Sequence, residues 1–250
     1  VGQKYLLESI DAPMVKSYVF YEKDRAKKWI ENTSFPKVFK LRSGAGSYNV
    51  FLIKDKQQAL KYLNQAFGRG FFPHTKLAVL KERIWHFKKN RDIKSLFKIS
   101  FGLYRYIFPN KIYKNLPRER NYIYAQDFIP NCDHDVRIYI IGDRALGKKR
   151  LVREGDFRAS GSGMFDWSDV PKECITKAFE VTSNIKAQSL AFDFVKDKDG
   201  YKIVEISYVA SVRAFLDAKG YWNKDLEWTE EELRAEYFII EDVLEKIKST

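Results

Sequence analysis

The order of apolar and polar residues predicts short strands interspersed with amphipathic helices. In residues 135–141 the two kinds alternate, so Asp135, Arg137 and Tyr139 share one face of a strand and the apolar residues between them share the other. Residues 171–187 instead repeat apolar residues at three- and four-residue spacing, which is typical of an amphipathic helix. This mixture of elements favours an α+β fold.

The same criteria predict the other regular elements. Strand patterns occupy residues 17–20, 37–41, 49–53, 122–128 and 144–153. Helical patterns occupy residues 3–10, 23–32, 55–67 and 229–248. Asp55 is expected to cap the third of these helices, and a capping box of Thr229 with Glu232 is expected to begin the last. Residues 208–228 are expected to form a loop.

The stretch 191–207 predicts a β-hairpin. Two alternating runs, 191–195 and 201–206, flank a turn that ends in Asp199-Gly200. A three-residue loop, Lys198-Asp199-Gly200, would close it with the glycine in the left-handed region. In that register Asp197 pairs with Tyr201.

Counting back along this hairpin places Asp193 directly opposite Glu205 on one face. The other face would hold four apolar residues, Phe192, Phe194, Val204 and Ile206. Two carboxylates that close repel each other unless a cation lies between them, and hard oxygen ligands suit Mg²⁺. The alternative is a pair of solvent-facing acids on an ordinary hairpin.

The length and composition of the chain predict the number of domains and the cellular compartment. A chain of 250 residues can hold one large α/β domain or two small ones around a sizeable core. Cys132 and Cys174 give no disulfide framework and suit a reducing compartment. No apolar run approaches the roughly 18 residues of a membrane-spanning helix, and no signal-peptide pattern is present. We therefore expect a cytoplasmic protein, with an N-terminal piece missing because the chain begins with Val1.

The net charge of +12 is concentrated in one segment. Residues 71–120 hold 13 Lys and Arg but 3 Asp and Glu, whereas the other 200 residues hold 32 and 30. Lysines and arginines alternate there with apolar and aromatic residues at helical spacing. Such a segment suits an anionic membrane surface or an anionic substrate, and a packed helical subdomain with a solvated basic side fits equally well.

Two further features suggest anion binding. Lys40 precedes a loop, residues 42–48, whose two glycines can fold over phosphates, although a plain glycine-rich turn has the same pattern. A return strand at 144–153 would gather four arginines, Arg137, Arg150, Arg153 and Arg158. Arginines that close are unfavourable unless an anion is expected among them, while separate solvated arginines are the alternative.

Taken in order, these motifs resemble those of ATP-grasp enzymes. The resemblance is closest to the bacterial ligases that add glutamate to ribosomal protein, and it extends more distantly to glutathione synthetases. The ordered set is Pro36-x-Val38-Phe39-Lys40, Gly44-x-Gly46-Ser47, Gln126-x-Phe128-Ile129, Asp135-Val136-Arg137, Arg150, Gly155-Asp156-Phe157-Arg158, Asp193 and Glu205. It covers about residues 1–215, apart from the insert at 71–120.

The resemblance implies two α+β lobes that clasp ATP, with a basic aromatic helical insert. Residues 1–70 would form the N-terminal part and first lobe, residues 71–120 the insert, and residues 121–250 the second lobe with a metal-binding hairpin and a C-terminal helix. Contacts to ATP are implied for Lys40, Gly44, Gly46, Ser47, Gln126, Asp127, Phe128 and Ile129. The arginines implied to face phosphate or an acylphosphate are Arg137, Arg150 and Arg158. Mg²⁺ would be bound by Asp193, Glu205 and Ser207.

The sequence departs from the family pattern at two points. At the metal, Glu205-Ile206-Ser207 stands where the family usually has Glu-x-Asn, and a hydroxyl is a poorer ligand than an amide carbonyl. The family also carries an N-terminal substrate domain ahead of the grasp, whereas this chain begins about where the grasp does. Either that domain was trimmed, or the insert has taken over substrate binding.

The resemblance implies an ATP-dependent carboxylate–amine ligase that acts through an acylphosphate. From the basic insert we expect an anionic acceptor, such as a surface glycan or lipid-linked precursor in polysaccharide biosynthesis, and peripheral association with the inner membrane face; nucleic acid is not an expected partner. One alternative is a kinase on the same fold, which moves phosphate to an alcohol. The other is a nucleotide- or polyanion-binding protein without turnover, which the unusual Ser207 would explain.

Overall fold

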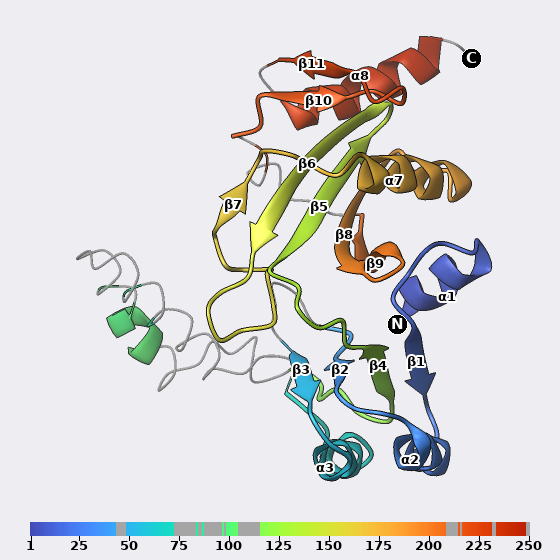
Figure 1. The fold of residues 1–250 in the computed structure, drawn as a ribbon, viewed down its shortest axis with the longest axis vertical. Helices are drawn as coiled ribbons and strands as arrows, with labels where there is room; N and C mark the ends of the chain where they lie inside the picture. The colour runs from blue at the N-terminus through green and yellow to red at the C-terminus, as the bar shows by residue number, and fades with distance from the viewer. Residues whose placement is uncertain are drawn as a thin grey trace. The chain divides into compact units, whose positions relative to one another are not determined.

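The computed structural model divides the chain into two compact units. It describes residues 1–43, 49–72, 84, 87, 97, 99–104, 116–208, 215, 217–231 and 234–248. Unit 1 comprises Val1–Ser17 with Ile129–Thr250, and unit 2 comprises Tyr18–Phe128. Both contain helices and largely antiparallel sheets, so the expected α+β class is confirmed (Figure 1). The predicted three-part division stays a prediction, since most of the insert lies outside the described residues.

Unit 2 is built on a four-stranded sheet in the order β1-β4-β2-β3. Its strands are β1 (Ser17–Phe20), β2 (Lys37–Lys40), β3 (Val50–Ile53) and β4 (Ile123–Asp127), and its helices are α2 (Lys23–Asn32) and α3 (Lys56–Ala66). Phe39 of β2 contacts both Trp29 and Tyr62, with ring centroids 6.3 and 5.0 Å away, and so joins the two helices to the sheet. Asp55 caps α3 by accepting a hydrogen bond from the Gln58 amide, as predicted.

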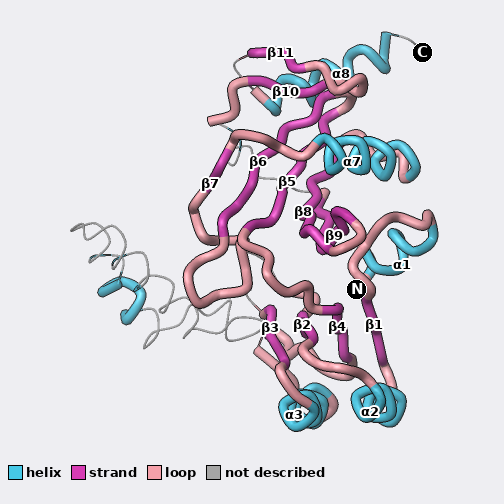
Figure 2. The backbone as a smooth tube through the Cα atoms, in the orientation of Figure 1, coloured by secondary structure: helices cyan, strands magenta, loops and turns pink. Residues whose placement is uncertain are grey.

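Unit 1 is built on a seven-stranded sheet in the order β11-β10-β6-β5-β8-β9, with β7 paired to β6. Its strands are β5 (His134–Ile141), β6 (Arg144–Leu151), β7 (Phe165–Asp166), β8 (Ser189–Asp197), β9 (Gly200–Ser207), β10 (Gly220–Trp222) and β11 (Trp228–Glu230). Its helices are α1 (Gly2–Ser9), α7 (Lys172–Asn184) and α8 (Ala235–Lys248). The path of the chain through these elements is traced in Figure 2.

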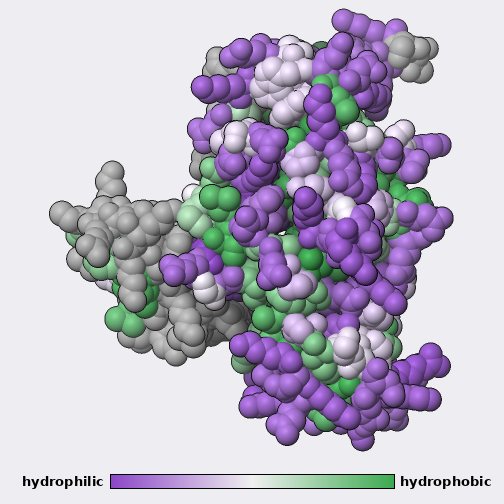
Figure 3. Space-filling model, viewed as in Figure 1, coloured by the Kyte–Doolittle hydropathy of each residue, from purple (hydrophilic) through white to green (hydrophobic). Residues whose placement is uncertain are grey.

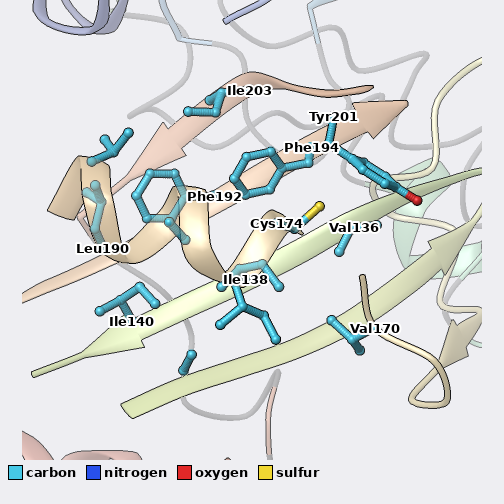
Figure 4. Packing of buried hydrophobic residues seen from close by; sticks show 14 of the residues in the cluster. Val136, Ile138, Ile140, Val170, Cys174, Leu190, Phe192, Phe194, Tyr201 and Ile203 are labelled. Atoms are coloured by element: carbon cyan, nitrogen blue, oxygen red, sulfur yellow. The ribbon is translucent and has the colours of Figure 1, made fainter. Parts of the chain in front are cut away.

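Helix α7 covers the apolar face of this sheet. Cys174, Ile175 and Ala178 of α7 are buried in one cluster with Val136 and Phe192 from the strands (Figure 4). The strand residues between these apolar positions face the other way, which is the alternation expected for β5. The sheet therefore has one packed face under α7. Its second face carries charged side chains and also a smaller buried cluster, in which Tyr139 and Ile141 join Phe238 of α8. On the side of the molecule seen in Figure 3, hydrophilic residues cover most of the described surface.

The β8–β9 hairpin has a different turn from the one predicted. Asp197 pairs with Gly200 rather than with Tyr201, so the loop has two residues, Lys198 and Asp199. Gly200 has φ +108°, and a Cβ there would lie 2.7 Å from the Glu173 carboxylate of α7. The backbone conformation therefore favours glycine, whereas the Glu173 carboxylate, at the end of a flexible side chain, could move away from a Cβ.

A β-bulge corrects the register farther along the same hairpin. The pairing shifts by one residue between Asp193 and Phe194, which leaves Val204 as the extra residue and restores Asp193 opposite Glu205. Ile203 rather than Val204 is therefore buried in the core, and the predicted place of Val204 on the apolar face is wrong. The predicted pairing of Asp193 with Glu205 is confirmed.

The N-terminal segment stabilises this bulge. Gln3 of α1 donates to the Val204 carbonyl (3.3 Å) and accepts from the Ile206 amide (3.1 Å). The Ile203 amide and carbonyl bond to Pro13 and Val15, at 2.8 and 2.9 Å. Backbone groups that the bulge would leave without strand partners are thus satisfied by residues roughly 200 positions away in sequence.

The C-terminal part also differs from the prediction. β10 and the start of β11 lie within the expected loop 208–228, where Trp222 and Trp228 pack with ring centroids 4.5 Å apart. Thr229 is part of β11 and α8 begins at Ala235, so the predicted capping box is wrong. Cross-strand pairing of the aromatic residues outweighs the local capping signal. Within the part of the chain that the structure describes, no helix is long and apolar enough to cross a bilayer.

Candidate functional site

A row of ionisable side chains crosses the second face of the unit 1 sheet. Lys148 of β6 pairs with Arg137 of β5, Arg137 pairs with Asp193 of β8, and Asp193 pairs with Glu205 of β9. Because directly paired residues point to the same side of a sheet, these four side chains share one face. Two residues along β5 and β6, Asp135 pairs with Arg150 on the same face.

Four members of this face form a largely buried ion-pair network. Arg137 and Arg150 approach the two carboxylate oxygens of Asp193 at 2.8 and 2.7 Å. Arg150 also donates two hydrogen bonds of 2.6 Å to Asp135, in the bidentate arrangement that guanidinium and carboxylate favour. The structure thus brings together two of the predicted arginines and one predicted metal ligand, while their catalytic roles stay a prediction.

The electrostatics of this network follow from burial and pairing. Burial opposes the charge on Arg150, but the carboxylates of Asp193 and Asp135 outweigh it and raise the pKa of Arg150. Burial raises the pKa of Asp135, and Arg150 opposes that shift. Two carboxylates held by two guanidinium groups form a rigid and nearly balanced charge arrangement.

Arg158 is held separately from these two arginines by Asp156. The guanidinium of Arg158 donates to both oxygens of the Asp156 carboxylate, at 2.9 and 2.8 Å. Burial opposes ionisation of Asp156, yet the hydrogen bonds and charge of Arg158 lower its pKa overall. Arg153 donates to the carbonyl of Gly161. These two partners, Asp156 for Arg158 and Gly161 for Arg153, are not members of the Asp193 network.

The predicted metal ligands are partly suited to Mg²⁺. Asp193 and Glu205 are adjacent across two strands on one face, and Ser207 follows Glu205 by two residues, so all three offer oxygen ligands on that face. The two arginine contacts use about half of the lone-pair sites of a carboxylate such as Asp193. In the described ranges no three His, Cys, Asp or Glu side chains lie close enough to form a metal site by themselves. A cation here would need phosphate or water oxygens as further ligands.

The predicted nucleotide ligands lie mainly in unit 2. Lys40 ends β2 and pairs with Val50. Gln126 is buried in β4, and Asp127 binds Lys37 through an ion pair of 2.7 Å. Phe128 and Ile129 follow directly, and Phe128 is the last residue of unit 2. Gly44, Gly46 and Ser47 lie outside the described residues.

The residues before the glycine-containing loop are fixed by a carboxylate that the sequence did not single out. Glu119 accepts a hydrogen bond of 2.9 Å from the Ser43 amide and another from the Tyr122 hydroxyl, while Tyr122 accepts from the Arg42 amide at 2.9 Å. Burial opposes ionisation of Glu119, but the hydrogen bonds from Ser43 and Tyr122 lower its pKa overall. Its signal in the sequence is modest: it is one of only three acids in the basic segment 71–120.

Lys148 was also not singled out from the sequence. It is 1% exposed, and its ammonium lies over the rings of Phe165, Trp167 and Phe215, at 3.8, 4.8 and 5.3 Å from their centroids. The available signal was its position two residues before Arg150 on a strand, which places both side chains on one face.

Comparisons with known proteins agree with the predicted resemblance. Residues 109–219 match the family model of the RimK-like ATP-grasp domain. No curated protein matches the sequence significantly.

Solved ATP-grasp proteins are similar to this chain in fold, at low sequence identity. The biotin carboxylase domain of the Hydrogenobacter thermophilus 2-oxoglutarate carboxylase, in complex with MgADP and bicarbonate, has TM-score 0.52 and 11% identity over 86% of this chain. The Campylobacter jejuni biotin carboxylase has TM-score 0.52 and 12% identity over 84%. The ATP-grasp ligase PsnB with its minimal precursor has TM-score 0.50 and 13% identity over 86%. The chain spans only 40%, 40% and 54% of those chains. It has the ATP-grasp fold.

Proposed function

We propose that this ATP-grasp chain is an ATP-dependent carboxylate–amine ligase. The observation that carries the proposal is the buried pairing of Arg137 and Arg150 with Asp193, directly across the sheet from Glu205. Phosphoryl transfer spreads negative charge over the transferring oxygens, and arginines fixed in advance can stabilise that charge without reorganising. The RimK-like match over residues 109–219 supports the same assignment.

The proposed reaction has two steps. An oxygen of the substrate carboxylate attacks the γ-phosphorus of ATP, the bond to the β,γ-bridging oxygen breaks, and ADP leaves. The amine nitrogen then attacks the acylphosphate carbon, an amide bond forms, and phosphate leaves with the carbon–oxygen bond electrons while the nitrogen loses a proton. Arg137, Arg150 and Arg158 are assigned to the phosphoryl oxygens in both steps.

Separate sets of residues are assigned to the nucleotide and to the metal. Lys40 and the loop of Gly44, Gly46 and Ser47 are proposed to bind phosphate, and the backbone of residues 126–129 to bind adenine. Asp193, Glu205 and Ser207 are proposed to hold Mg²⁺, which would neutralise charge on the phosphates when bound.

Replacing Lys40 by alanine is expected to weaken ATP binding roughly ten- to a hundredfold, because a charge-assisted contact to phosphate is lost. Calorimetric titration with MgATP measures the effect, and the melting temperature checks the fold. Lys54→Ala is the matched control, since this exposed lysine follows β3 of the same unit. Equal affinities for the Lys40 variant and its parent would remove Lys40 from the phosphate site.

The acid substrate is proposed to be anionic, such as a surface-glycan or lipid-linked precursor, with the basic segment 71–120 as its recognition element. That segment is expected to bind vesicles containing an anionic lipid at low salt and to release them as salt rises. Replacing Lys88, Lys89, Arg91 and Lys94 by glutamine should abolish this binding and leave MgATP affinity unchanged. A parent protein that ignores anionic vesicles and anionic glycans at low salt would contradict this part of the proposal.

Analysis of products tests the reaction itself. A ligase releases ADP and free phosphate and forms an amide, whereas a kinase transfers the phosphate to an alcohol and releases none. Screening pools of acids and amines for phosphate release, followed by mass spectrometry of the products, separates these outcomes. Nucleotide binding without any release across the pools would favour a binding protein without turnover.

A further inference from the structure

The aromatic enclosure of Lys148 is the feature of unit 1 that the proposed chemistry leaves unexplained. Phe165 and Trp167 come from β7 and the residue after it, and Phe215 comes from the segment that follows β9. Three rings around one ammonium form an aromatic cage, which stabilises a cation by the negative faces of the rings. Here the caged cation belongs to the protein itself.

The charged neighbours of Lys148 are mainly cations. Arg137 is its direct partner on β5 and Arg150 lies two residues along β6, and both disfavour the charge on Lys148. Asp217, beyond Phe215, favours that charge but is outweighed by the two arginines. Burial is the largest cause, and together these lower the pKa of Lys148 to about 8.

The charge of Lys148 makes the net charge of the side chains on this face more positive. Arg137 and Arg150 are matched by Asp135 and Asp193 within the ion-pair network, so Lys148 adds one further positive charge beside a balanced group. Glu205 ends the same row, but it is exposed on the far strand and is therefore screened by solvent. A methionine of similar length would pack in the same enclosure without burying a charge near two arginines.

We propose that Lys148 is a positioning residue that makes the face of Arg137 and Arg150 an oxyanion-binding site, acting through its charge rather than by touching the anion. The ligand class is a doubly charged oxyanion of the phosphate type. This inference rests on the proposed function for the identity of the natural anion, which in the proposed ligase reaction is the phosphoryl group being transferred. A positive charge held in low dielectric beside the two arginines strengthens their attraction for an anion and opposes their complete neutralisation by Asp135 and Asp193.

Sulfate is the probe, because its charge does not change between neutral and alkaline pH. The full-length protein is titrated with sulfate by calorimetry against chloride of matched ionic strength, at pH 7 and pH 9.5. Lys148→Met is expected to weaken sulfate binding about tenfold at pH 7, as expected for the loss of one nearby charge. The parent should weaken to the affinity of that variant at pH 9.5, where Lys148 loses its proton. Lys148→Arg should bind with similar affinity at both pH values, because arginine keeps its charge.

Lys149→Met is the matched control. This neighbour lies on the opposite face of β6 and pairs with the exposed Asp169, so its loss removes the same net charge and should leave sulfate affinity within about twofold. Circular dichroism checks that each variant is folded. If Lys148→Met does not fold, the pH dependence of sulfate binding in the parent and in Lys148→Arg decides the role of the Lys148 charge. Unchanged sulfate affinity in Lys148→Met, or an equal alkaline loss in Lys148→Arg, overturns the inference.

MgADP titration of the same proteins keeps the two proposals distinguishable. If MgADP fails to bind while sulfate behaves as described, the role of Lys148 stands and the proposed ligase activity loses its nucleotide. If MgADP binds and sulfate affinity is indifferent to Lys148 and to pH, the ligase proposal stands and the role of Lys148 is rejected.

Discussion

Replacing Arg150 by methionine is expected to lower the free energy of unfolding at pH 7 by about 3–5 kcal/mol, because it leaves two buried carboxylates with too few cations. Arg150 binds both Asp135 and Asp193. Its removal leaves Asp135 without the bidentate partner and leaves Asp193 with Arg137. Urea unfolding monitored by circular dichroism measures the loss.

The deficit is expected to shrink as pH falls from 7 to 5. In the variant, burial without the opposing Arg150 charge raises the pKa of Asp135 further above its unfolded value near 3.9. The folded variant then binds more protons than its unfolded chain across that interval, so its stability rises as pH falls. Lys149→Met serves as control, because its pairing with exposed Asp169 predicts a loss of no more than about 1 kcal/mol. Equal effects of the two substitutions would show that the Arg150 network does not stabilise the fold.

Replacing Glu205 by glutamine is expected to weaken divalent-metal binding at least about tenfold and to abolish phosphate release, since the amide keeps the shape but loses the charge of a hard ligand. Because Glu205 is exposed, the free energy of unfolding of the Glu205→Gln variant should differ from that of the parent by no more than about 0.5 kcal/mol. Binding of Mn²⁺ in the presence of ADP, followed by electron paramagnetic resonance, reads the metal site independently of activity. Glu180→Gln, an exposed carboxylate on α7, is the matched control.

Ser207→Asn tests the departure from the family pattern at the same site. An amide carbonyl is a better metal ligand than a hydroxyl, so this variant should bind Mn²⁺ more tightly than its parent. If Glu205→Gln binds Mn²⁺ as the parent does and retains its rate, the β8–β9 hairpin is not the metal site. If only Ser207→Asn has no effect, the assignment of Asp193 and Glu205 stands, and Ser207 is better explained by substrate contact.

Local pattern predicted the elements of this chain where one face is apolar and the other polar. β5 follows directly from its alternation, and α3 from its helical spacing and the Asp55 cap. The local pattern did not predict β10 and β11, because each has three residues and so short a run has almost no periodicity. Their stability comes from pairing with each other and with β6, which the order of residues does not display.

The β8–β9 hairpin shows how a correct result can arise from an incorrect local register. The sequence predicted Asp193 opposite Glu205 from a three-residue loop, whereas the structure reaches the same pairing through a two-residue loop and a bulge at Val204. The turn depends on Gly200, and the bulge depends on hydrogen bonds with Gln3, Pro13 and Val15. Those contacts come from distant segments, so no pattern within residues 191–207 could specify them.

The sequence by itself determined the α+β class, the ATP-grasp resemblance, and the side of β5 on which Arg137 lies, because side-chain alternation is a local property of a strand. Only the tertiary structure decided which carboxylates the arginines bind, since Asp135, Arg150 and Asp193 come from three different strands. It alone also placed Lys148 within an aromatic enclosure. Pairing and burial depend on strand order and register, and these are set by long-range packing rather than by neighbours in sequence.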